Sequence, residues 1–210
     1  MNNFFKSLFL ALSFCLLFNS SAMAGVVEAK LFVDNLGKQT IDIVSNKNFT
    51  ETAKREKLEH LFTSNVNLNW IGKFVLGKHW REASEAQRTR YLKNYQVFIV
   101  RSYTDRFMQY AGEKFKILNA KEDGPGNYLL TMEIQRQQDA NVLVDYKIRE
   151  EVGVASNKKY QIYDLVVEGV SMIATQRSEF SSVVTRNGLD YLIDRLEKKP
   201  VLAKTPVRAS

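Results

Sequence analysis

The chain has 210 residues, with 30 Lys plus Arg, 23 Asp plus Glu, two His and one Cys. A chain of this length can bury one hydrophobic core as a single domain. The net charge of +7 suits anionic partners such as phosphate headgroups, although basic side chains on a solvated surface are a commoner cause of such a charge. No concentrated run of Lys and Arg is present, so nucleic acid is not expected as a partner.

Residues 1–24 have the pattern of an export signal. Lys6 precedes an apolar run from Leu8 to Phe18, and the small-x-small pattern Ala22-Met23-Ala24 follows. The alternative is a retained membrane anchor, but the apolar run is shorter than the roughly 20 residues that span a bilayer. We therefore expect cleavage after Ala24. Cys15 would be removed with the signal, which excludes disulfides and thiolate metal sites from the mature chain.

Helical spacing dominates the first half of the mature chain. Helices are expected from Val26 to about Ser45 and from Glu51 to Phe62, followed by a short helix capped by Asn67 and ended by Gly77. A capping box, Ser84 to Gln87, opens a long helix that is expected to reach Tyr110. Its apolar residues recur every three or four positions and form one stripe; they are Leu92, Tyr95, Ile99, Tyr103, Phe107 and Tyr110.

Alternating apolar and polar residues then predict strands. Strands are expected in "KFKILNA", around Tyr128 to Ile134, from Val142 to Arg149, and in "YQIYDLVVEG", which ends at Gly169. Two helices follow, the first ended by Asn187-Gly188 and the second by Pro200. No internal repeat is found. The element order predicts an α+β fold with helices packed around a curved, mostly antiparallel four-stranded sheet, forming one domain over residues 25–199. Residues 200–210 are expected to be a disordered tail.

The sequence provides little catalytic chemistry. His60 is expected on the exposed side of its helix and His79 in a structural or surface position, and they are not in metal-ligand spacing. No glycine-rich phosphate loop is found. The chain is therefore not expected to be an enzyme or to hold a metal or cofactor.

The segment "NWIGKFVLGKHW", residues 69–80, concentrates large apolar side chains and two glycines in twelve residues. Together with the aromatic stripe of the long helix, it leaves two interpretations open. One is an ordinary core rich in aromatic residues. The other is a pocket between the curved sheet and the long helix that holds an apolar ligand. Composition does not separate them.

Several segments resemble the MlaC family, whose members are periplasmic lipid-binding components of an ABC transport system and are also known as toluene-tolerance proteins. They are "NWIGKFVLGKHW", "YLKNYQVFIVRSY", "VDYKIRE", "YQIYDLVVEGVSMIATQRSEFSSVV" and "RNGLDYLIDRLEKK", in that order. The similarity covers nearly the whole mature chain. The stretch "EEVGVASNKK" departs from the family, which usually has a short Gly-centred turn there, so the shape of that hairpin is open.

This resemblance implies a nuclear-transport-factor-like fold and a periplasmic carrier of phospholipid, with the acyl tails held between sheet and helices. It also implies two partners, an inner-membrane ABC transporter complex and an outer-membrane lipoprotein complex, and a role in outer-membrane lipid asymmetry. A monomer is expected. The residues expected to contact lipid are Phe74, Val75, Trp80, Tyr95, Ile99, Tyr103, Leu130, Met132, Val144, Tyr146, Val167, Val170 and Ile173.

Two alternatives remain beside the phospholipid carrier. A branch of the family is associated with hopanoids, so the cargo could be a terpenoid lipid. The same fold type also hosts proton-transfer enzymes that use a buried Asp with a Tyr. Tyr163-Asp164 and Asp145-Tyr146 supply these residue types, but neighbours on a strand point to opposite faces and could not act together in one pocket.

Overall fold

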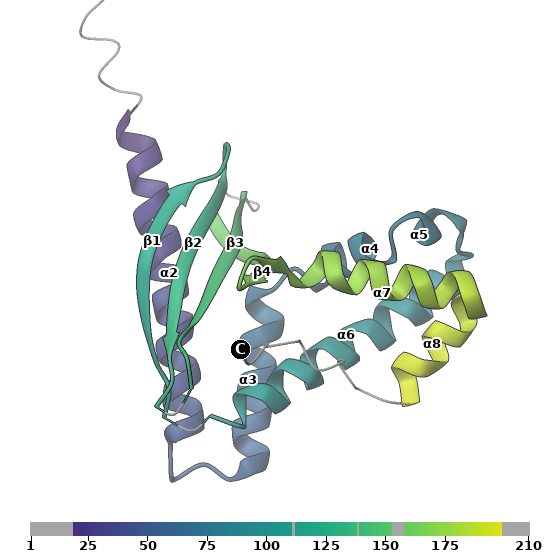
Figure 1. The fold of residues 1–210 in the computed structure, drawn as a ribbon, viewed down its shortest axis with the longest axis horizontal. Coiled ribbons are helices and arrows are strands. Elements are labelled where there is room, and N and C mark those ends of the chain that lie inside the picture. Colours follow the sequence, from purple (N-terminus) through teal and green to yellow (C-terminus); the bar gives the residue numbers. More distant parts are fainter. Residues whose placement is uncertain (1–18, 111, 138, 153–157, 199–210) are drawn as a thin grey trace, which may run out of the picture.

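The computed structural model describes residues 19–110, 112–137, 139–152 and 158–198 (Figure 1). Most of the expected export signal and the tail from residue 200 lie outside these ranges. Within the described residues, the helices that precede the sheet are α2 (Asn19–Ser45), α3 (Glu51–Asn65), α4 (Leu68–Leu76), α5 (Lys78–Glu82) and α6 (Glu85–Phe107). The strands are β1 (Lys114–Glu122), β2 (Asn127–Gln135), β3 (Val142–Val152), β4 (Lys158–Val167) and β5 (Val170–Ser171), followed by α7 (Met172–Asn187) and α8 (Leu189–Lys198).

The strands form one antiparallel sheet in the order β1-β2-β3-β4-β5. Leu130 pairs with Tyr146 and Met132 with Val144 across β2 and β3, so these four side chains share one face. The α+β class and the antiparallel meander are confirmed. The expected number of four strands is wrong by one, because the chain turns back after Gly169 and adds β5 at the edge.

Helix α2 lies against the sheet and contacts β1 and β2 (Figure 1). Four small or medium residues at i, i+4 spacing form its contact face, Gly25, Ala29, Val33 and Gly37. A Cβ atom on Gly37 would lie 2.7 Å from the Phe115 ring. Real side chains do not approach so closely, so glycine at these positions lets the helix lie flush on the strands.

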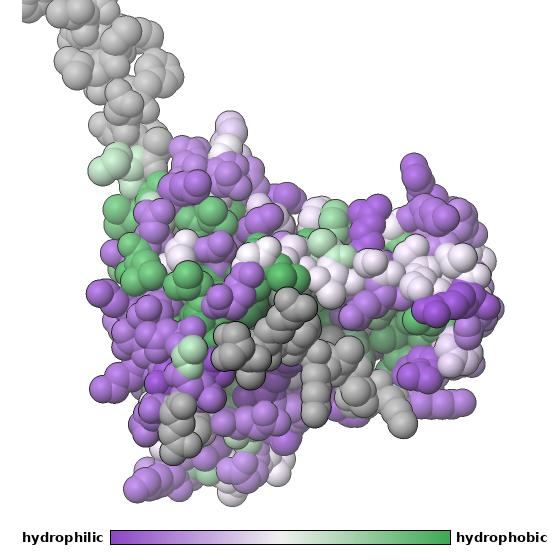
Figure 2. All heavy atoms as spheres, in the orientation of Figure 1, coloured by the Kyte–Doolittle hydropathy of each residue, from purple (hydrophilic) through white to green (hydrophobic). Residues whose placement is uncertain are grey.

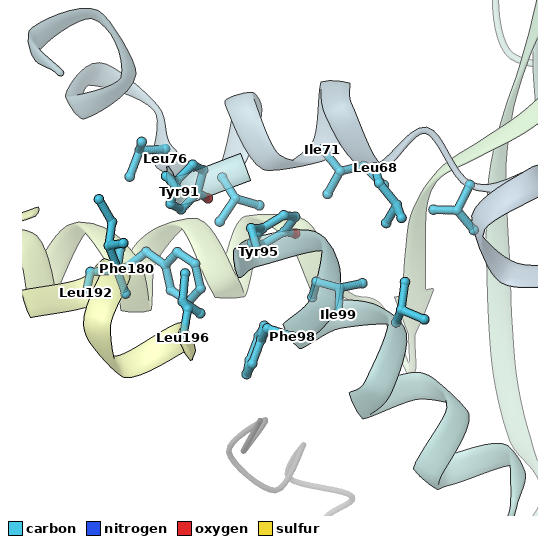
Figure 3. Close-up of a cluster of buried hydrophobic side chains, with 14 of the residues drawn as sticks. Leu68, Ile71, Leu76, Tyr91, Tyr95, Phe98, Ile99, Phe180, Leu192 and Leu196 are labelled. Atoms are coloured by element: carbon cyan, nitrogen blue, oxygen red, sulfur yellow. The ribbon is translucent and has the colours of Figure 1, made fainter. Parts of the chain in front are cut away.

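Helices α4 to α8 build the other end of the molecule, and α3 lies between them and α2 (Figure 1). Tyr91, Tyr95, Phe98 and Ile99 of α6 point into a cluster completed by α4, α7 and α8 (Figure 3). Tyr91 is fully buried and donates a hydrogen bond to the Gly72 carbonyl at 3.0 Å. The expected stripe on the long helix missed Tyr91 and Phe98, because the buried face is wider than one i, i+3/i+4 row.

The expected caps of α4, α6 and α7 are confirmed. Asn67 caps α4 by accepting a hydrogen bond from Trp70 N, and Gly77 ends that helix at φ 61°. The capping box of Ser84 and Gln87 opens α6, and Gly188 at φ 87° ends α7. Three bounds differ: α2 begins at Asn19 and not at Val26, α3 ends at Asn65 and not at Phe62, and α6 ends at Phe107 and not at Tyr110. In addition, α5 was not expected. None of the described helices is long and apolar enough to cross a membrane.

Candidate functional site

The buried apolar residues form two clusters. The sheet cluster contains Ala29 and Val33 of α2 with Tyr128, Leu130, Met132 and Ile148 of the strands. The helical cluster is formed by residues of α4, α6, α7 and α8, together with Val66 and Ile162. Figure 2 shows apolar side chains gathered over the sheet end and again in the helical end of the molecule.

Two side chains, Phe32 of α2 and Tyr146 of β3, pack against both clusters. Near them, Tyr103 of α6 stacks on Phe62 of α3 with ring centroids 5.2 Å apart. All four residues are partly buried, whereas the clusters on either side are closed. We call Phe32, Phe62, Tyr103 and Tyr146 the aromatic seam, because they lie where the sheet end meets the helical end.

Two phenol groups give the seam its only polar atoms. Burial and, to a smaller extent, the neighbouring phenol of Tyr103 together raise the pKa of Tyr146 to about 12. Burial also raises the pKa of Tyr103; Arg106 opposes this shift and Asp164 adds to it. Both groups are therefore neutral across physiological pH. The seam offers aromatic surface with hydroxyl groups that can donate or accept a hydrogen bond.

The structure brings only some of the expected lipid-contacting residues to the seam. Tyr103 and Tyr146 belong to it, and Leu130 and Met132 lie on the sheet side, with Val144 buried next to Met132 in the strand register. Val75, Tyr95 and Ile99 lie deep in the helical cluster, and Phe74, Trp80 and Ile173 pack on its outside. Val167 is half-buried, and its partner Val170 on β5 is 49% exposed.

An aromatic and cationic stack, missed by the sequence reasoning, ties the sheet to the helices. Trp70 stacks on Phe74 at 5.1 Å and meets Tyr163 edge-on. The Arg149 guanidinium lies 5.2 Å from the Trp70 ring centroid, and Arg177 lies 4.8 Å from that of Phe74. Such contacts fix β3, β4, α4 and α7 together. Sequence spacing gives no sign of it, because the residues come from four separate elements.

Asp164 forms a second link between the sheet and a helix. It is 3% exposed and accepts hydrogen bonds from Ser171 Oγ at 2.8 Å and Ile173 N at 3.3 Å, at the start of α7. Lys147 Nζ lies 3.8 Å away. Ser171 is the N-cap of α7, since its Oγ accepts a hydrogen bond from Ala174 N at 3.2 Å, and the Asp164 carboxylate supports this cap.

The two carboxylates considered for proton transfer make hydrogen bonds that hold the fold together. Asp164 accepts hydrogen bonds from Ser171 Oγ and Ile173 N at the start of α7, and Asp145 accepts one from Thr131 Oγ1 at 2.6 Å. Asp145 precedes Tyr146 on β3, so its side chain points to the opposite face of the sheet. Within the described residues, no group of three His, Cys, Asp or Glu side chains could hold a metal ion. His60 is exposed, and His79 is buried with Nδ1 3.0 Å from Glu82.

A groove of about 680 Å³ lies along the outer face of α7. Its lining is polar, with two guanidinium groups and four hydroxyl groups among the side chains; the residues are Ala174, Arg177, Ser178, Ser181, Ser182, Thr185 and Arg186. Such a lining would leave acyl chains against polar atoms.

Fold and site together define an α+β protein of one domain whose aromatic side chains lie between a sheet cluster and a helical cluster. The MlaC protein family model matches residues 34–198. The chain therefore belongs to the MlaC family.

Two similar proteins extend this assignment. A relative from Haemophilus influenzae is named the intermembrane phospholipid transport system binding protein MlaC. It is 28% identical over 173 residues, which cover 80% of this chain and 76% of the relative. A phospholipid-binding protein from Ralstonia solanacearum, solved in complex with a phospholipid, has a similar fold with a TM-score of 0.63. It is 14% identical, and the match covers 84% of this chain and 96% of that one.

Proposed function

We propose that this protein is a periplasmic carrier that holds the acyl tails of a phospholipid at the aromatic seam. It would carry the lipid between an inner-membrane ABC transporter complex and an outer-membrane lipoprotein complex and so maintain outer-membrane lipid asymmetry. The name of the Haemophilus relative and the phospholipid bound by the Ralstonia protein support this assignment. The carrier would be a monomer, released into the periplasm by cleavage after Ala24.

The need for a carrier follows from the cost of hydrating acyl chains. Each methylene exposed to water costs about 0.8 kcal/mol, so two chains with on the order of 30 methylenes cost roughly 25 kcal/mol. A diacyl lipid therefore does not cross an aqueous compartment alone at a useful rate. A carrier must bury the tails against apolar side chains with a comparable gain in free energy. It must also release them when it docks.

The observation that carries the proposal is the placement of the seam. Phe32 and Tyr146 contact both hydrophobic clusters, and Phe62 and Tyr103 stack beside them. A ligand inserted here would separate the two clusters and would meet apolar side chains on both sides. The links through Asp164 and through Arg149 would hold the sheet and helices together at one edge while the seam widens.

The start of α4 is also fixed to the sheet. Asn67 N donates a hydrogen bond to the Ile162 carbonyl at 3.0 Å, and Asn67 Nδ2 donates to Glu151 at 2.7 Å. Opening for release would therefore leave this point closed and would move α2 or the far end of the sheet. Transfer requires no bond to be made or broken.

The test is lipid extraction. The protein is purified from the periplasm without detergent, extracted with organic solvent, and the extract is analysed by mass spectrometry. Co-purified diacyl phospholipid at close to one molecule per chain is the expected result. A cyclic terpenoid would replace the phospholipid assignment with a hopanoid-type cargo, and an extract without lipid would contradict the carrier function.

A further inference from the structure

The expected first residue of the mature chain lies in a tight contact. Gly25 is buried, and a Cβ atom there would lie 2.1 Å from Tyr128 Oη. Because the backbone nitrogen is two bonds, about 2.5 Å, from that Cβ position, the nitrogen is within about 5 Å of the phenol oxygen. Cleavage after Ala24 would turn this nitrogen into an α-ammonium group with three donors.

The surroundings of Gly25 are rich in acceptors. Tyr128 Oη donates to Glu150 Oε2 at 3.1 Å, and Tyr160 Oη donates to Glu28 Oε2 at 2.7 Å. The two tyrosine rings lie 5.8 Å apart, edge to face. Glu28 is three residues after Gly25 on the same helix, so the two positions share a helix face.

We infer that Tyr128, Tyr160, Glu28 and Glu150 form a binding site for the α-ammonium group of the processed chain. The inference rests on the proposed cleavage after Ala24. It does not depend on an unidentified ligand, because the nitrogen atom that would be bound is already held beside the phenol by the contact between α2 and the sheet.

The charged neighbours favour an ammonium group here. Burial, then the hydrogen bond to Glu150 and the charges of Glu150 and Glu122, together raise the pKa of Tyr128 to about 12, although a hydrogen bond with Tyr160 opposes the shift. Burial, Glu28 and Glu150 likewise raise the pKa of Tyr160. These groups come from α2, β1, β2, β3 and β4. The charged side chains that shift the two phenols are carboxylates, and the phenols also act on each other.

The dipole of α2 opposes the binding of an ammonium group at this site. The first turn of a helix carries a partial positive charge of about one half, which disfavours an ammonium group there. A carboxylate in hydrogen-bond contact carries a full charge and accepts a charge-assisted hydrogen bond, so it outweighs the helix end where contact is made. The two effects predict opposite shifts of the α-amino pKa, and its measurement therefore decides between them.

The consequence is a link between maturation and folding. Before cleavage, the nitrogen of Gly25 is an amide with a single donor. After cleavage, an ion pair would fix the start of α2 to β2 and β3, over the sheet cluster and next to Phe32 of the aromatic seam. The processed carrier would hold α2 more firmly than the precursor does.

The test measures the α-amino pKa by the pH dependence of acylation at the N-terminus. Chains beginning at Gly25 are prepared with a site-specific protease that leaves no extra residue, and intact mass verifies the terminus. The expected pKa is at least one unit above the ordinary value of about 7.7 to 8.0, so acylation at pH 8 is slowed several-fold relative to the unfolded chain. Glu150→Gln should return the pKa toward that range.

Two controls keep the outcome clear. Glu28→Gln probes the second carboxylate if Glu150→Gln fails to fold, and circular dichroism verifies each fold. A chain with one Ala added before Gly25 moves the ammonium out of the site and should show an ordinary pKa.

An unshifted or lowered pKa in the folded Gly25 chain would overturn the inference. A different N-terminus in periplasmic material would overturn only the cleavage after Ala24, because the engineered terminus still tests the site.

Discussion

The Tyr95 hydroxyl of α6 donates a hydrogen bond to Gln176 Oε1 of α7 at 2.7 Å, and both side chains are buried in the helical cluster. Burial raises the pKa of Tyr95 well above its ordinary value, so the phenol stays a donor. The bond joins α6 and α7, the two longest helices of the helical end, and so stabilises the helical cluster beside the aromatic seam.

Tyr95→Phe should destabilise the protein without changing the amount of lipid bound. The substitution leaves Gln176 without its buried donor, which costs about 1–3 kcal/mol of unfolding free energy. Urea unfolding measures the loss. Tyr191→Phe, at a residue 42% exposed, is the control and should change stability by less than about 0.5 kcal/mol. Loss of lipid from folded Tyr95→Phe would instead place this residue at the ligand.

Asp164→Ala should loosen the start of α7. It removes the acceptor of Ser171 Oγ and Ile173 N, and we expect a cost of about 2 kcal/mol with faster amide exchange in the first turn of α7. Hydrogen–deuterium exchange of the backbone amides, measured by mass spectrometry, shows whether the first turn of α7 opens more often. Asp139→Ala removes an exposed carboxylate paired with Arg136 and should have little effect. Unchanged exchange in α7 would show that Asp164 does not support the Ser171 cap.

Gly37→Ala should destabilise the protein, which is the opposite of its usual effect within a helix. In an exposed helix, alanine is favoured over glycine by about 1 kcal/mol. Here the new methyl group would lie 2.7 Å from the Phe115 ring, and overpacking costs about 1–3 kcal/mol. Thermal unfolding shows whether the variant is less or more stable than the unsubstituted protein. Asn35→Ala, on the exposed face of α2, should be neutral or stabilising, and stabilisation by both variants would refute the flush contact of α2 with the sheet.

Alkaline pH should unfold the protein through its buried phenols. The folded-state pKa of Tyr146 is about 12, above the unfolded value of about 10. The neutral form is therefore favoured by folding, and this stability is fully present below pH 10 and is lost as the pH rises through 12. Circular dichroism and tyrosinate absorbance recorded together should show one coupled transition. Tyr146→Phe should weaken the dependence of stability on pH. Ionisation of all the phenols near pH 10 in the folded state would contradict the burial of Tyr146.

The sequence was most informative where one short segment determines the structure. The caps at Asn67 and Ser84 and the strand alternation around Leu130 and Tyr146 depend on neighbouring residues, and the structure confirms them. Gly72 also lets α4 pack closely on α6, since a Cβ atom there would lie 2.9 Å from Leu92 and Tyr95.

The parts that could not be predicted depend on contacts between distant elements. Arg149 and Trp70 are 79 positions apart along the chain and meet because β3 passes α4. Asp164 and Ser171 meet only because the chain turns back through Gly169. The apolar pattern identified buried residues such as Val75, but it could not separate those in a closed cluster from those at the aromatic seam. That distinction depends on how the sheet and the helices are placed.

The position of the lipid tails tests the account most directly. Purified protein is loaded with a phospholipid that carries a photoactivatable diazirine within one acyl chain, irradiated and digested, and the modified peptides are identified by mass spectrometry. The account predicts crosslinks in the peptides of the aromatic seam, those that contain Phe32, Phe62, Tyr103 and Tyr146, and their loss when excess unlabelled phospholipid is added. Crosslinks confined to the polar groove of α7 around Ser178 and Ser182, with the seam unmodified, would contradict it.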